Sequence, residues 1–125
     1  SGIILHDAAG LGMKHWLENY PPTDENDYLK TWTANPDEWK NASPIYFLDA
    51  EIPPFLIYIG EKTYPSLKVG NDRFLRELNK NQKSVSTILV NKGHIPMVLQ
   101  YFWPWSDRYK EIYDFMNKAS FITDK

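Results

Sequence analysis

The sequence predicts an α/β domain built on a parallel sheet. Three apolar runs rich in β-branched or aromatic residues occupy positions 2–6, 55–60 and 85–90. Segments with helix start signals or helical spacing lie between these runs and after the last one. Strands that alternate with helices favour parallel pairing, because each helix returns the chain to the edge where the next strand starts. We therefore expect a three-layer arrangement with helices on both faces of the sheet.

The first run, residues 2–6, is short and apolar and ends at Asp7 before a small-residue stretch, Ala8-Ala9-Gly10. This pattern predicts a buried strand. A chain that opens inside a core strand suggests that part of the domain precedes it. A remnant of a purification tag at Ser1-Gly2 is the alternative explanation.

A long excursion follows, in which short helices are expected. Residues 11–20 carry apolar and aromatic side chains at helical spacing and end at a Pro-Pro pair, and residues 27–33 are a second helix candidate. An Asn-Pro-Asp-Glu sequence at 35–38 combines an N-cap residue, proline at the first helical position and acids in the first turn. Ser-Pro at 43–44 repeats this signal for a short helix through Leu48.

The second half of the chain alternates strand and helix. Residues 55–60 are nearly all apolar and close with glycine, which indicates a central strand buried on both faces. A helix begins at Ser66, and Gly70 weakens it by about 1 kcal/mol relative to alanine. Residues 85–90 are the third strand, a turn spans 91–94, and a final helix runs from a cap at Ser106 through Lys118. The apolar sides of the two helices are predicted to be Leu67, Phe74, Leu75 and Leu78, and Tyr109, Ile112, Tyr113 and Met116.

Length and composition exclude several classes of protein. A chain of 125 residues and 14.7 kDa fits one domain, residues 1–125. With 14 Lys and Arg against 16 Asp and Glu, it has no basic excess to neutralise nucleic acid phosphates. Apolar runs are far shorter than the ~20 residues of a membrane helix, and no signal peptide is visible. The absence of cysteine excludes disulfides and thiolate chemistry but does not fix the compartment.

Residues whose side chains could take part in catalysis follow the carboxyl ends of the predicted strands, which is where ligands bind in open α/β sheets. His94 comes just after the third strand and could act as a general base, with a structural loop histidine as the alternative. Asp7 comes just after the first strand and could hold an imidazole in the required tautomer, with turn or cap hydrogen bonding as the alternative. The segment 61–65 follows the central strand.

Other site chemistry is poorly supported by the sequence. No serine stands in a G-x-S-x-G motif, and N-capping accounts for Ser43, Ser66 and Ser106. His6 and His15 lack a second metal ligand at helical spacing, and no Gly-rich phosphate loop follows a strand, so we expect neither a metal nor a cofactor. Most aromatic residues are expected to pack in the core. The Trp-Pro-Trp sequence at 103–105 is the exposed exception and leaves sugar binding as a further alternative.

The order of these motifs resembles the carboxyl-terminal half of an α/β-hydrolase of the esterase and lipase branch. The likeness rests on SPIYFL at 43–48, PPFLIYIGEK at 53–62, the helix with Arg73-Phe74 and GH at 93–94. It extends over nearly the whole chain. The resemblance implies a hydrolase sheet, a small-molecule ester substrate, His94 as the catalytic histidine and residues 11–48 as a cap-like excursion over the site.

Two departures from the family pattern affect the catalytic assignment. Family members carry the serine nucleophile and oxyanion hole in an amino-terminal half, which residues 1–125 do not contain. The catalytic acid usually follows the strand that corresponds to 55–60, where this chain has Thr63. Some members place the acid after the preceding strand instead, so the resemblance assigns this role to Asp7. Glu61 is the poorer alternative, because it lies two residues before the usual position.

The expected function is therefore that of a serine esterase part that supplies the acid and the histidine. Alone, the chain should not turn over esters. Strand 2–6 would expose an unpaired apolar edge, which should pair with the missing amino-terminal half or with a second copy. The alternative is a non-catalytic interaction module derived from a degenerate hydrolase, with Thr63 as the mark of decay.

Overall fold

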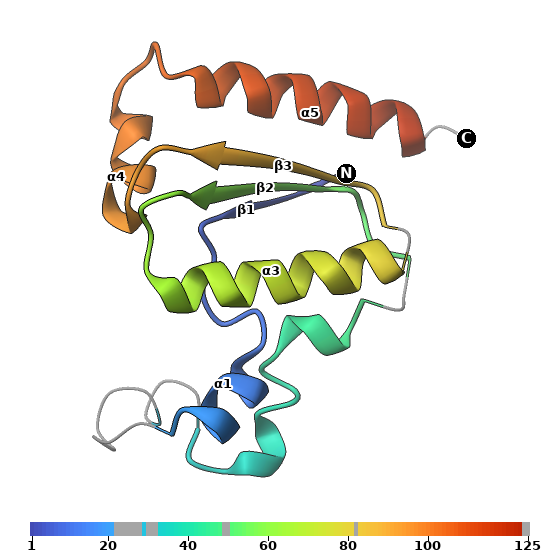
Figure 1. The fold of residues 1–125 in the computed structure, drawn as a ribbon. Helices are drawn as coiled ribbons and strands as arrows, with labels where there is room; N and C mark the ends of the chain where they lie inside the picture. Colours follow the sequence, from blue (N-terminus) through green and yellow to red (C-terminus); the bar gives the residue numbers. More distant parts are fainter. Residues whose placement is uncertain (22–28, 30–32, 49–50, 82, 124–125) are drawn as a thin grey trace.

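The sheet has three parallel strands, as the sequence predicts. The computed structural model describes residues 1–21, 29, 33–48, 51–81 and 83–123. Among them, β1 (Ile3–His6), β2 (Phe55–Gly60) and β3 (Val85–Val90) lie side by side in the order β1-β2-β3 (Figure 1). Both strand pairs are parallel. The α/β class is thus confirmed.

The central strand β2 is the core of the domain. All six of its residues are buried, as a strand covered on both faces requires. Its register places Ile57 between Leu5 of β1 and Thr87 of β3. Because side chains alternate along a strand, Phe55, Ile57 and Ile59 face one layer of helices and Leu56 and Tyr58 face the other.

Helix α3 (Pro65–Lys80) covers one face of the sheet. Phe74 and Leu78 are buried against β2, and the Phe74 ring meets the Phe55 ring edge-on at 5.7 Å. The helix passes through Gly70 without a break. Burial of an apolar face stabilises this helix enough to offset the low helix propensity of one glycine.

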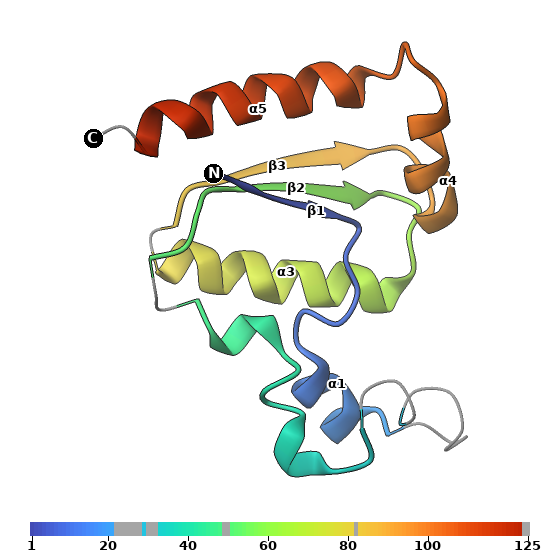
Figure 2. The same cartoon turned by 180° about the vertical axis from the view of Figure 1, so that it is seen from behind.

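Helix α5 (Asp107–Thr123) covers the opposite face, which completes three layers (Figure 2). The predicted apolar side of this helix is wrong. Tyr109, Tyr113 and Met116 are exposed, whereas Phe115 and Ala119 are buried and Ile112 is partly buried. Phe115 packs against Gly2, the residue before β1: a Cβ added there would lie 2.6 Å from the Phe115 ring, so glycine allows the close approach of the ring.

The excursion is less helical than predicted. Helix α1 spans Met13–Asn19, but the Asn-Pro and Ser-Pro signals each produce a single 3₁₀ turn, Pro36–Glu38 and Pro44–Tyr46. The Ser43 hydroxyl does not cap its own turn; it accepts a hydrogen bond from the Lys14 N–H in the first turn of α1. Most of the predicted helix 27–33 lies outside the described residues. In both views α1 lies on the side of α3 that faces away from the sheet.

A short helix that the sequence reading missed closes the carboxyl edge of the sheet. The turn after β3 ends at Gly93, and α4 (His94–Leu99) begins at the histidine itself, followed by a 3₁₀ turn at Gln100–Phe102. Met97 is fully buried and fixes α4 against Tyr58 and Val90. The helix therefore sets the position of His94.

None of the helices in the described part of the chain has the length and apolar character needed to cross a bilayer.

The packing of α5 can be tested with two aromatic residues of the same helix. Phe115→Ala should lower the free energy of unfolding by about 3–5 kcal/mol, because it leaves a cavity beside β1. Tyr113→Ala, at a residue with 66% of its surface exposed, should change it by less than about 0.5 kcal/mol. Urea denaturation of both variants is the measurement. Equal losses would mean that the buried side of α5 is assigned incorrectly.

Candidate functional site

The structure brings Asp7 and His94 together at the carboxyl edge of the sheet. Asp7 directly follows β1, and His94 opens α4 after β3. The Nδ1 atom of His94 lies 2.7 Å from Oδ2 of Asp7, although 87 residues separate the two in sequence. This is the convergence that the sequence predicts for the two side chains. Their catalytic role is a separate matter and stays a prediction.

Asp7 is held by the backbone as well as by its side chain. Its φ of 49° lies in the left-handed region, which aspartate tolerates better than most residues. Its N–H donates to the Tyr58 carbonyl, so the strand pairing of β1 and β2 continues through this residue. The chain then turns away from the sheet, and the carboxylate remains over the end of β2 with only 1% of the residue exposed.

Three donors satisfy the buried Asp7 carboxylate. Oδ1 accepts a hydrogen bond of 3.0 Å from the Gly60 N–H. Oδ2 accepts from the Thr63 hydroxyl and faces Nδ1 of His94. A desolvated carboxylate is costly unless such partners are present. These three contacts tie together the ends of all the elements that form this edge.

Thr63 therefore has a role that the sequence reading missed. The sequence presents Thr63 only as an uncharged residue shortly after the central strand, yet its hydroxyl donates a hydrogen bond to the Asp7 carboxylate. Glu61, the alternative acid, is exposed, and its contacts come from the backbone: its carbonyl accepts from Lys68 and its N–H donates to the Val90 carbonyl. The geometry thus selects Asp7, and not Glu61, as the partner of His94.

Gly60 is required for the close approach of two loops beneath the site. A Cβ at this position would lie 2.7 Å from the Lys92 carbonyl oxygen and 3.2 Å from Cβ of Thr63. The loop after β3 can therefore cross directly over the end of β2. This crossing carries His94 toward Asp7.

His94 is oriented and accessible. The contact with the carboxylate assigns the proton of the neutral ring to Nδ1, which leaves Nε2 with a lone pair. About 36% of the side chain is exposed, and the Tyr64 ring flanks it at 5.9 Å. Nε2 has no hydrogen-bond partner among residues 1–21, 29, 33–48, 51–81 and 83–123. Such an imidazole can accept a proton from a hydroxyl group that approaches from solvent.

No described serine occupies that position beside Nε2. The Ser43 hydroxyl is buried and donates to the Trp39 carbonyl, and Ser66 lies inside the first turn of α3 instead of before it. Within the described chain there is also no group of three His, Asp or Glu side chains that could hold a metal ion.

A second polar cluster lies on the α5 face of the sheet and was not foreseen. The His6 ring stacks on Tyr58 at 4.8 Å, and its Nε2 bonds to the Tyr101 hydroxyl. The Arg108 guanidinium lies 5.3 Å from the Tyr58 ring centre and pairs with Glu111 at 2.8 Å. Burial, together with the charge of Arg108, lowers the pKa of His6 below its ordinary value.

Comparisons with protein-family models, with curated proteins and with solved structures give no match for this chain. The interpretation of the site therefore rests on the geometry described above.

The role of Thr63 can be tested with a near-isosteric change. Thr63→Val should lower the free energy of unfolding by about 1.5–3 kcal/mol, because the buried carboxylate loses a donor. Thr87→Val, at an exposed position of β3, should change it by less than about 0.5 kcal/mol. Denaturant titrations at neutral pH give both values. Thr63→Ser should retain most of the stability, and a loss as large as that of valine would show that packing, not the hydroxyl, is what matters.

The lowered pKa of His6 predicts a pH dependence of stability. Above pH 6.5 the ring is neutral in the folded and unfolded chain alike. Below pH 6.5 the unfolded chain takes up a proton that the folded chain does not, so the free energy of unfolding falls as the pH falls toward the folded pKa. The slope from this group is at most about 1.4 kcal/mol per pH unit, less for solvent screening.

Urea midpoints measured at several pH values check this dependence. His6→Asn should flatten the decline below pH 6.5 relative to the unmodified chain. An unchanged slope in the His6 variant would contradict the assignment.

Proposed function

We propose that this chain is the part of an α/β-type serine ester hydrolase that carries the catalytic acid, Asp7, and the catalytic base, His94. The observation that supports this most is the contact between Nδ1 of His94 and the buried Asp7 carboxylate at the carboxyl edge of a parallel sheet. Open α/β sheets bind their substrates at this edge. The proposed substrate is a small carboxylic ester.

The proposed mechanism begins with proton transfer to His94. Nε2 takes the proton of a serine hydroxyl while the serine oxygen attacks the ester carbonyl carbon. Asp7 keeps the ring in the Nδ1–H tautomer and stabilises the imidazolium that forms. The imidazolium then gives its proton to the departing alcohol oxygen, which leaves an acyl-enzyme. Water hydrolyses the acyl-enzyme through the same histidine, which returns the serine hydroxyl.

In this proposal the serine belongs to a polypeptide segment outside residues 1–125. That segment would pair with β1, which is an edge strand in the sheet order β1-β2-β3. Ile4 of this strand is 37% exposed on the face that α5 covers elsewhere. An apolar edge strand favours pairing with a further strand. A segment there would also lie next to Asp7, since Asp7 follows β1 directly.

The environment of Asp7 favours a catalytic site over the alternative of a degenerate hydrolase that has lost its activity. A hydrolase remnant released from catalytic function would not need to keep a carboxylate buried, because desolvation of a charge costs several kcal/mol. Here three donors from Gly60, Thr63 and His94 converge on that carboxylate. The hydrogen bond from Thr63 to Asp7 therefore favours a site in which Asp7 serves as the catalytic acid over a site that has lost its acid.

The proposal predicts where a serine-directed probe will react. We expect a fluorophosphonate to label the assembly isolated from cells that naturally produce this chain, on a serine outside residues 1–125. Labelling should fall by about two orders of magnitude or more in assemblies carrying His94→Gln or Asp7→Asn, because the serine loses its base or the base its orientation. Glu61→Gln is the matched control and should label normally. Mass spectrometry of the labelled peptides is the measurement.

Two results would contradict this function. Purified residues 1–125 that hydrolyse p-nitrophenyl acetate in a His94-dependent way would place the nucleophile inside this chain. An assembly in which no serine is labelled would favour the non-catalytic interaction module.

A further inference from the structure

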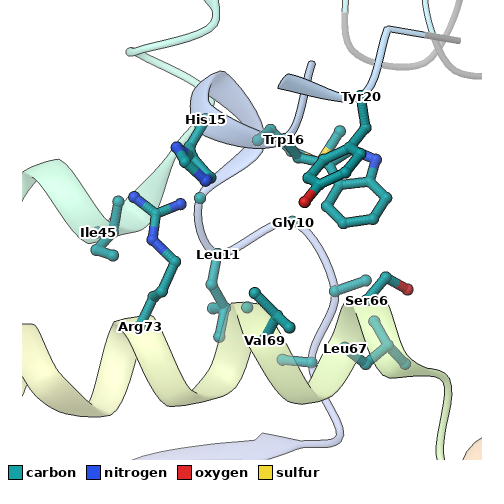
Figure 3. A pocket seen from close by; sticks show the side chains of 15 residues that line it. Gly10, Leu11, His15, Trp16, Tyr20, Ile45, Ser66, Leu67, Val69 and Arg73 are labelled. Carbon is teal, nitrogen blue, oxygen red and sulfur yellow. The ribbon is translucent and has the colours of Figure 1, made fainter. Parts of the chain in front are cut away.

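We propose that the hollow between α1 and α3 is a binding site for a flat aromatic carboxylate, separate from the Asp7–His94 site. The hollow lies on the side of α3 that faces away from the sheet. Its walls come from the loop at residues 8–12, from α1 and from the first half of α3 (Figure 3). Neither Asp7 nor His94 lines it.

One end of the hollow holds a cation that has no counter-ion within the described part of the chain. Arg73 is half-buried, yet its guanidinium makes no hydrogen bond or ion pair with any described residue. A Cβ added to Gly12 would lie 3.9 Å from Nη1 of Arg73, so the guanidinium rests over the glycine of the opposite wall. Among the described residues that line the hollow there is no aspartate or glutamate. A partly desolvated guanidinium in such a place favours an anionic ligand.

A second donor faces the same space. Nδ1 of His15 lies 3.1 Å from the Asn19 side-chain amide, which donates to it and leaves the ring proton on Nε2. Figure 3 shows the His15 and Arg73 side chains pointing toward one another from α1 and α3. Two donors that converge from separate elements match the two oxygens of one carboxylate.

The other end of the hollow is aromatic and apolar. Trp16 and Tyr20 stack at 4.6 Å with 30° between their ring planes, and Leu67 and Val69 stand across from them on α3. Tyr20 is 59% exposed and Val69 is 49% exposed, so this surface is open to a ligand. A flat ring would bury apolar area here and gain ring contacts with the aromatic pair.

The spacing along α3 sets the size of the ligand. Ser66 and Arg73 both line the hollow and are seven residues apart, which is about 10 Å along a helix. Between them, a Cβ added to Gly70 would meet nothing within 4 Å, so the floor of the hollow is open. A carboxylate attached to a fused two-ring system fits this length, with its charge at Arg73 and its rings at Trp16.

Calorimetric titration of residues 1–125 with 2-naphthoate tests the site. We expect a dissociation constant of about 0.1 mM or tighter, and binding weakened about tenfold or more by Arg73→Gln, which loses the charge. Arg76→Gln is the matched control, because Arg76 is exposed on the same helix and does not line the hollow. The uncharged analogue 2-naphthalenemethanol should bind about tenfold or more weakly than the carboxylate.

A second variant blocks the hollow without threatening the fold. Gly70→Leu should fill the open floor and abolish binding, while thermal denaturation followed by circular dichroism should show an unchanged or raised midpoint. The proposal is overturned if the unmodified chain does not bind 2-naphthoate at millimolar concentration. It is equally overturned if Arg73→Gln binds like Arg76→Gln, if the alcohol binds like the acid, or if the folded Gly70→Leu chain still binds. None of these readouts depends on ester hydrolysis.

Discussion

The Asp7 carboxylate is the interaction on which the carboxyl edge of this domain depends. It is a charge with almost no access to water, and it is satisfied by groups from the end of β2, from the loop before α3 and from the start of α4. Because a buried charge without partners is strongly destabilising, each of these elements has to be in place for the others to hold. The same contacts that stabilise the edge also orient the imidazole of His94. The contacts of one buried carboxylate therefore determine both the packing of this edge and the orientation of its histidine.

The strands were predictable from the sequence, and the helix faces were less so. The apolar runs at 55–60 and 85–90 coincide with β2 and β3, because a Pro-Pro pair and polar residues bound the first run and polar residues bound the second on both sides. The buried side of α5 could not be predicted from periodicity. Two tyrosines and a methionine stand at helical spacing, as the residues of a buried apolar side would, but they are exposed in the structure. The buried side carries Phe115, which packs against Gly2, more than a hundred residues away in the sequence, and belongs to the core cluster that contains Tyr58 and Met97.

The candidate site shows the same division. Asp7 and His94 follow strand ends, and parallel strands end at one edge, so their meeting could be expected from topology. The donor role of Thr63 could not, because it depends on the position of a hydroxyl relative to a carboxylate 56 residues earlier. The cluster around His6 was equally hidden. It combines β1, β2, the 3₁₀ turn after α4 and the first turns of α5, and no local pattern links these segments.

Because α4 begins at His94, its first residue moves with the whole helix. Met97 lies one turn further along and is locked, with no exposed surface, into the cluster that contains Tyr58 and Phe115. The imidazole is thus mechanically linked to the layer of α5 on the far side of the sheet. A small rotation of α4 about Met97 would move the His94 ring away from the Asp7 carboxylate and leave the strands in place. The alignment of His94 with Asp7 consequently depends on how tightly α5 packs against the sheet.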